Sequence, residues 1–144
     1  MNESNLGLQT LIGETEREGT DEELTAAIYA RTSSSSKQFG YSIDGQVRKC
    51  WRRCQQLDWT VSHVFCDEDI SGKDPDRPMF QMLLEQAEYG DIDVIVFWKL
   101  DRFSRSLMHA VKLEEQLRNW GVGLHSITEL IDTTTPTGRF NFRN

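Results

Sequence analysis

The sequence lacks the features that most readily identify a nucleotide-binding or membrane protein. It contains neither a GxGxxG pattern nor a GxxxxGK[ST] loop, and it has no internal repeat. No apolar run approaches the roughly 20 residues of a membrane span. No basic region followed by an apolar region marks the N-terminus as a signal peptide. We therefore expect a cytoplasmic protein that does not contact a membrane.

Cysteine is also scarce, and its pattern argues against a disulfide framework or a metal site. The three cysteines, Cys50, Cys54 and Cys66, form no CxxC pair. Cys50 and Cys54 are spaced to place two ligands on one helix face, but no second pair completes a site. We expect buried thiols in a reducing compartment, and neither a metal nor another cofactor.

A broad basic surface is missing as well, because the chain carries a net charge of −7. Most of this charge lies near the N-terminus, where residues 1–25 contain seven acidic side chains and one basic side chain. Eleven of the sixteen basic residues in the whole chain are arginine, whose two-pronged guanidinium holds phosphate well. We predict an acidic extension over residues 1–24, one domain over residues 25–144, and weak DNA binding by this chain alone.

Strand and helix patterns alternate along the predicted domain. The predicted strands are 24–32, 59–66, 93–100 and 122–127, and the predicted helices are 42–57, 76–90 and 107–120. Ser42 and Asp76 are the expected N-caps of the first two helices. The core of the predicted strand 24–32 is apolar at consecutive positions, as in a strand that is covered on both faces. The predicted strand 93–100 is the most continuously apolar, so we expect it at the centre of the sheet. This alternation predicts an α/β fold, with a parallel sheet flanked by helices.

Polar residues follow three of the predicted strands at the point where each strand ends. They are Arg31 and Ser33 after the first, Asp67, Ser71 and Arg77 after the second, and Asp101, Arg102 and Arg105 after the third. The carboxyl ends of parallel strands share one edge of the sheet, so these side chains are expected to converge. Several guanidinium groups suit the negative charge of a phosphorus centre under attack, and a serine there is a candidate nucleophile. The sequence places no histidine at this edge, which disfavours a Ser-His-Asp triad.

Other interpretations of these residues remain open from the residues alone. A single serine after a strand is usually a loop or cap residue, and an adjacent Asp101–Arg102 pair is usually a surface ion pair. Any of the serines 33–36 is a candidate nucleophile. A metal-dependent phosphoryl transfer would find oxygen ligands for Mg²⁺ in Asp67, Glu68, Asp69 and Asp101. Such an enzyme would not need so many arginines.

Four segments of the chain together resemble the catalytic domain of the serine recombinases, a family of resolvases, invertases and phage or transposon integrases. They are Tyr29–Ser33, Ser42–Gln46, Asp67–Gly72 with Arg77–Pro78, and Lys99–Arg105. They follow the family's order, and the segment 132–139 looks more like the large, integrase-type members. The resemblance implies a three-layer, resolvase-like fold whose mainly parallel four-stranded sheet has the order 2-1-3-4.

The resemblance also implies a mechanism for cutting and rejoining DNA. Ser33, two residues after Arg31, matches the nucleophile that attacks a DNA phosphodiester and forms a 5′-phosphoserine link, without a metal or other cofactor. The family's phosphate-binding arginines are matched by Arg31, Arg77, Arg102 and Arg105. Asp101 matches the acid that accompanies these arginines. Gln46 and Ser71 match positions that are expected to contact the substrate.

The chain departs from the family pattern in two respects. Thr32 stands where valine is more common, and the sequence stops at Asn144, before the long dimerisation helix and DNA-binding region of family members. The resemblance implies a site-specific DNA recombinase that binds double-stranded DNA and acts as a homodimer and synaptic tetramer when full length. We expect this 144-residue chain alone to be monomeric or weakly associating, and inactive. A serine transposase and a non-enzymatic regulatory module remain alternatives.

Overall fold

Strands and helices alternate in the computed structural model, as the sequence predicts. The model describes residues 23–33, 42–69, 77–104 and 106–134, with the backbone alone at Ser33 and Asp69. In chain order the elements are β1 (Thr25–Ser33), α2 (Ile43–Gln56), β2 (Thr60–Asp69), α3 (Pro78–Tyr89), β3 (Val94–Phe97), α4 (Leu100–Phe103), α5 (Leu107–Asn119) and β4 (Gly123–Ser126). The α/β fold class is therefore confirmed.

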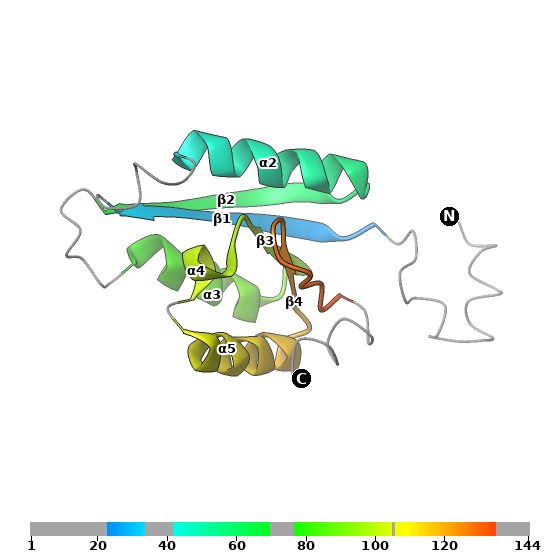
Figure 1. The fold of residues 1–144 in the computed structure, drawn as a ribbon. Helices are drawn as coiled ribbons and strands as arrows, with labels where there is room; N and C mark the ends of the chain where they lie inside the picture. The colour runs from blue at the N-terminus through cyan, green and yellow to red at the C-terminus, as the bar shows by residue number, and fades with distance from the viewer. Residues whose placement is uncertain (1–22, 34–41, 70–76, 105, 135–144) are drawn as a thin grey trace.

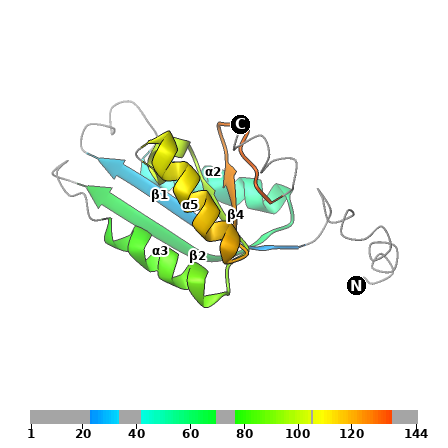
Figure 2. The ribbon, with the colours of Figure 1, turned by 90° about the horizontal axis from the view of Figure 1, so that it is seen from below.

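The four strands form one sheet in the order β2-β1-β3-β4, and each pair of neighbours is parallel. This arrangement confirms the predicted order 2-1-3-4. Helix α2 covers one face of the sheet, and α3, α4 and α5 lie on the other face, which gives three layers (Figures 1 and 2). Sequence neighbours on β1 serve opposite faces: Ala26 and Ile28 pack toward α2, and Ala27 and Tyr29 pack toward α3 and α5. Both faces of β1 are therefore buried.

One predicted helix cap is confirmed, and two other local predictions are wrong. Ser42 caps α2, and its hydroxyl accepts a hydrogen bond from the Gly45 backbone at 3.2 Å. The N-cap of α3, however, is Arg77 rather than Asp76, and Arg77 has a left-handed backbone with a φ of 48°. The structure also ends β3 at Phe97 and adds the short helix α4, which the predicted strand 93–100 overran.

None of the helices in the described ranges is both long enough and apolar enough to cross a membrane.

Loss of a buried side chain in α3 should test this packing. Leu83 is 0% exposed between α3 and the sheet, so Leu83→Ala should lower the free energy of unfolding by about 2–5 kcal/mol because it leaves a cavity. The adjacent Met82 is 50% exposed, and Met82→Ala should change the free energy by about 0.5 kcal/mol or less. Urea unfolding of both variants measures the difference. Equal effects would show that α3 does not pack as described.

Candidate active site at the carboxyl ends of β1 and β3

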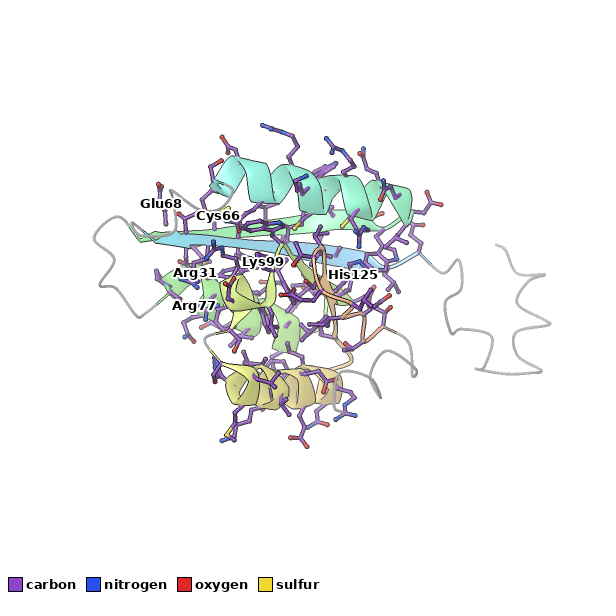
Figure 3. All side chains as sticks on the ribbon, viewed as in Figure 1. Arg31, Cys66, Glu68, Arg77, Lys99 and His125 are labelled. Carbon is purple, nitrogen blue, oxygen red and sulfur yellow. The ribbon has the colours of Figure 1, made fainter. Side chains whose placement is uncertain are left out.

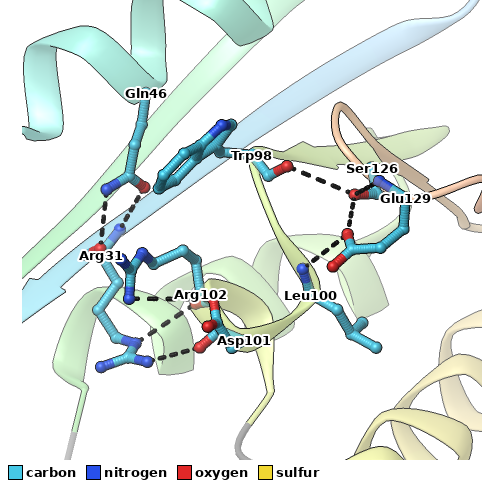
Figure 4. A network of polar contacts seen from close by, with 8 residues as sticks. All are labelled: Arg31, Gln46, Trp98, Leu100, Asp101, Arg102, Ser126 and Glu129. Atoms are coloured by element: carbon cyan, nitrogen blue, oxygen red, sulfur yellow. Dashed lines mark hydrogen bonds and ion pairs between the residues drawn. The ribbon is translucent and has the colours of Figure 1, made fainter. Parts of the chain in front are cut away.

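The short helix α4 follows β3 and organises the polar residues at this edge of the sheet. A single helical turn leaves most of its backbone carbonyl groups without partners inside the helix. Arg31, on β1, donates from Nη2 to the Asp101 carbonyl at 2.6 Å and from Nε to the Arg102 carbonyl at 3.4 Å (Figure 4). Arg77 donates from Nη2 to the Phe103 carbonyl at 2.6 Å. Two arginines from different elements are thereby fixed on the same turn.

The first backbone N–H group of α4 is held by a residue that the sequence analysis missed. Glu129, after β4, accepts a hydrogen bond from the Leu100 backbone at 3.0 Å and another from the Ser126 hydroxyl (Figure 4). A carboxylate suits this end of the turn because the unpartnered N–H groups carry partial positive charge. The signal was available in the sequence, since Glu129 follows the fourth predicted strand at the same edge of the sheet.

Gln46, on α2, holds the backbone of Arg31. Strand β3 pairs with β1 only as far as Tyr29, so the backbone of Arg31 has no neighbouring strand on that side. Gln46 supplies the missing partners: its Oε1 accepts from the Arg31 N–H at 3.2 Å, and its Nε2 donates to the Arg31 carbonyl at 3.0 Å. Gln46 is 0% exposed. Its amide therefore acts as a short substitute for a strand.

A buried chain of hydrogen bonds holds Arg77. The Tyr29 hydroxyl donates to Asp67 Oδ2 at 2.7 Å and accepts from Arg77 Nε at 3.3 Å. Asp67 also accepts from the backbone N–H groups of Met79 and Phe80, at 2.9 and 3.0 Å, and so serves as the cap that Arg77 does not provide for α3. The Arg77 guanidinium lies 3.8 Å from the centre of the Phe80 ring. Sequence reasoning named Tyr29 only as part of a motif. It named Asp67 as a polar residue after the second strand and as a candidate magnesium ligand, but not as the cap of α3.

Burial determines the charge states of Tyr29 and Arg77 in this hydrogen-bond network. Burial raises the pKa of Tyr29, and the neighbouring Asp67 carboxylate adds to the effect, so the hydroxyl keeps its proton at neutral pH. Burial lowers the pKa of Arg77, and the positive charge of Arg31 also lowers it, although Tyr29 and Asp67 oppose this change. The Arg77 guanidinium remains charged at neutral pH.

Arg102 presents a buried donor that no described residue satisfies. Arg102 is 9% exposed, and its guanidinium lies 5.4 Å from the centre of the Trp98 ring. Its Nε atom has no hydrogen-bond partner among the described residues, and its Nη1 atom lies 3.9 Å from an oxygen of the exposed Asp101 carboxylate. A buried N–H group without a protein acceptor is costly, and either a water molecule or a ligand oxygen would stabilise it.

The structure brings together five of the eight predicted site residues: Arg31, Gln46, Arg77, Asp101 and Arg102. Figure 3 shows Arg31 and Arg77 near the end of β1. Ser33 is the last residue of β1, and its backbone is in register with Asp69 of β2. The side chain of Ser33 lies outside the described part of the chain, as do Ser71 and Arg105. Their predicted roles stay predictions.

The magnesium alternative loses its first proposed ligand. Both carboxylate oxygens of Asp67 accept backbone hydrogen bonds from α3, and one also accepts from Tyr29. A metal ion at Asp67 would have to replace these bonds. Within the described ranges, no group of three His, Cys, Asp or Glu side chains lies close enough together to hold a metal ion.

One histidine lies closer to α4 than the sequence indicated. His109, on α5, contacts the hydroxyl of Ser104 through Nδ1 at 2.9 Å, and Ser104 directly follows α4. The Ser104 hydroxyl donates to the Ser106 carbonyl at 3.0 Å, so His109 is placed to donate to Ser104 rather than to take its proton. Ser104 and His109 therefore form a polar contact at the N-terminus of α5, and this geometry does not suit a hydrolase triad.

Comparison with known proteins agrees with this geometry. The chain belongs to the resolvase family, because residues 26–143 match the family model "Resolvase, N terminal domain". It is 45% identical over 76 residues to a DNA-invertase of Enterobacteria phage P7, an alignment that covers 53% of this chain and 40% of the invertase. It is 31% identical over 115 residues to the Tn917 transposon resolvase of Enterococcus faecalis, which covers 80% of this chain and 55% of the resolvase.

A solved structure shares the fold. The N-terminal catalytic domain of TP901-1 integrase matches 83% of this chain and 88% of its own length, with a TM-score of 0.72 and 29% identity. The resemblance to serine recombinases that the motifs indicated is therefore confirmed. The matched relatives include both invertases and an integrase domain, so the preference for the integrase type stays a prediction. The chain spans less than half the length of the P7 invertase.

Removal of the Tyr29 hydroxyl should test the buried hydrogen-bond network at Arg77. Tyr29→Phe keeps the ring but removes a donor to Asp67 and an acceptor for Arg77, and it should lower the free energy of unfolding by about 1–3 kcal/mol. Tyr89→Phe is the matched control, because Tyr89 is 81% exposed and should tolerate the same change. Denaturant unfolding at neutral pH measures both. A Tyr29→Phe variant as stable as the control would contradict this network.

Proposed function

We propose that this chain cuts and rejoins double-stranded DNA through Ser33, as the catalytic part of a site-specific recombinase. The observation that carries the proposal is the clustering of Arg31, Arg77 and Arg102 around α4, beside the end of the strand that bears Ser33. Membership of the resolvase family and the names of the invertase and resolvase relatives support the choice of DNA as substrate.

The way in which the arginines are held favours a phosphate ligand. Arg31 and Arg77 donate to backbone carbonyl groups and to a tyrosine hydroxyl, which orient a guanidinium without neutralising it. The carboxylate of Asp67 serves the start of α3, and that of Asp101 lies at the exposed surface. Positive charge therefore remains to stabilise the oxygens of a phosphodiester under attack, where charge develops in the transition state.

The proposed reaction exchanges one phosphoester bond for another. The Ser33 oxygen attacks the phosphorus of a DNA phosphodiester, and the bond from phosphorus to the 3′ oxygen breaks. The serine loses its proton, the departing 3′ oxygen gains one, and the 5′ phosphate stays attached to Ser33. Attack by a 3′ hydroxyl on this link reverses the step and rejoins the strand. No external energy source is needed, because one phosphodiester-type bond is present at each stage.

The residues around Ser33 have distinct proposed roles. Arg31, Arg77, Arg102 and Arg105 bind the phosphate and lower the proton affinity of the serine. Asp101 transfers a proton to or from the reacting oxygens, for which its exposed position beside Arg102 is suitable. Gln46 positions Arg31 through its backbone, and Ser71 contacts the substrate.

Recombination requires more than one copy of this site, since two DNA duplexes carry four strands. We propose that the full-length protein acts as a homodimer that pairs into a synaptic tetramer, and that this 144-residue chain alone associates weakly and recombines little. The chain spans 40% of the P7 invertase and 55% of the Tn917 resolvase, which is consistent with further regions in those relatives. A serine transposase would use the same chemistry, and DNA-target mapping would separate the two.

A covalent intermediate should form on a nicked DNA suicide substrate in the presence of EDTA. The full-length protein should retain label placed at the 3′ end of the cleaved strand, because the 5′ phosphate of that piece is attached to serine. Label at the 5′ end should not shift with the protein on a denaturing gel. Ser33→Ala should abolish the adduct, and Ser34→Ala and Ser35→Ala should retain it. An adduct that survives Ser33→Ala, requires a metal or carries the 5′ label would contradict the mechanism.

Arg102 should increase the rate of covalent adduct formation through its positive charge and its unpartnered Nε donor. Arg102→Gln should reduce the rate of adduct formation by about 100-fold or more, the size of effect seen when a donor to a developing oxyanion is removed. Arg118→Gln is the control, because Arg118 lies on α5 and pairs with Glu114 at 3.6 Å. Single-turnover kinetics on the suicide substrate measure both rates. Similar losses in the two variants would exclude a specific role for Arg102.

A further inference from the structure

A groove with an apolar floor and two cationic side chains runs between α2 and the edge strand β2. Its lining includes Val47, Trp51, Val64 and Cys66 together with Arg48, Arg52 and one acid, Asp44, and its volume is about 510 Å³. Trp51 is 43% exposed and Val64 is 39% exposed, and both large apolar side chains line this one groove. The groove lies on the α2 face of the sheet, and Figure 3 shows Cys66 beneath α2. It is separate from the hydrogen bonds around α4.

The charge of α2 suggests an acidic occupant. The helix carries Arg48, Lys49, Arg52 and Arg53 against a single acid, Asp44. A second copy that presented the same face would set these cations against their own equivalents. DNA would satisfy the cations but would gain little from Trp51 and Val64. A segment that combines carboxylates with aliphatic side chains fits both parts of the groove.

The first 22 residues of the chain have this composition. They contain six acidic side chains and one basic side chain, and they include Leu6, Leu8, Leu11 and Ile12. The cationic and apolar residues of the groove alternate along α2, as Val47, Arg48, Trp51 and Arg52. A segment that carries both carboxylates and aliphatic side chains can therefore contact both kinds of residue along the groove.

The start of β1 is close to one end of the groove. Thr60, the first residue of β2, donates from its hydroxyl to Glu23 at 2.7 Å and from its backbone to the Leu24 carbonyl at 2.9 Å. Helix α2 ends at Gln56, four residues before Thr60, and is about 21 Å long at 1.5 Å per residue. The residues between Ile12 and Glu23 span about 16 Å as a helix or about 36 Å when extended. Either conformation allows the leucines to reach the groove.

We propose that residues 1–22 dock in the groove between α2 and β2 of the same chain, with their leucines against Trp51 and Val64 and their carboxylates near Arg48 and Arg52. The docked segment would cover the outer face of the helix whose Gln46 holds Arg31. This inference concerns a surface away from the arginine cluster, and it holds whether or not Ser33 is a nucleophile.

The native Cys66 provides a reporter for docking. The full chain is treated with iodoacetamide, a neutral thiol reagent, and alkylation at Cys66 is followed by mass spectrometry at one fixed pH. Burial, with the Asp67 and Asp44 carboxylates, raises the pKa of the Cys66 thiol, so all rates must be compared at the same pH. The Leu8→Asp/Leu11→Asp variant should release the segment and increase the Cys66 alkylation rate several-fold. Cys50 and Cys54 are 0% exposed, and slow reaction there shows that the fold is intact.

A matched variant separates docking from a simple change of charge. Asn5→Asp/Gln9→Asp adds the same charge to the same segment and should leave the Cys66 rate unchanged. The Arg48→Glu/Arg52→Glu variant should increase the rate, as should about 0.5 M salt in the native chain, since salt screens exposed charge pairs. Equal rates in the leucine and control variants would overturn the proposal. Protection that depends on protein concentration would assign the groove to a second copy, and protection that appears only with duplex DNA would assign it to DNA.

Discussion

The carbonyl groups of α4 are the contacts on which the candidate site depends. A helix of one turn cannot satisfy its own backbone, and here its free carbonyls accept from Arg31 on β1 and from Arg77 at the start of α3. Glu129 holds the other end of the turn through the Leu100 backbone. Three segments that are far apart in the sequence are thereby fixed relative to one another. The turn orients guanidinium groups without neutralising them, which is the property that a phosphate site requires.

Asp67 also helps to position an arginine without neutralising its charge. This carboxylate caps α3 and accepts from Tyr29, so it positions Arg77 through a hydroxyl rather than through a direct ion pair. The arrangement keeps the Arg77 charge available and keeps its side chain within an aromatic environment beside Phe80. Gln46 performs a comparable role for Arg31, because it binds only the backbone of that residue. Each arginine is thus held by a neutral group whose own position is fixed by burial.

Much of the fold was predictable because its signals are local. Consecutive apolar residues predicted β1 and β3, the spacing of apolar residues predicted the long helices, and Ser42 was correctly assigned as a cap. The errors arose where a distant group replaced a local one. Asp76 was the expected cap of α3, but the carboxylate of Asp67 fills that role from the neighbouring strand. Helix α4 was missed because four residues contain too little periodicity to identify a helix.

The sequence by itself predicted that Arg31, Gln46, Arg77, Asp101 and Arg102 belong to one site, because strand ends and their polar residues are encoded over short distances. It also determined family membership through four short motifs in a set order. Only the tertiary structure decided how Arg31, Arg77 and Arg102 are held, which required contacts such as the one between Arg77 and the Phe103 carbonyl. The physical reason is that a hydrogen bond between side chain and backbone has no sequence pattern of its own. Its partners become neighbours only when the sheet brings β1 and β3 together.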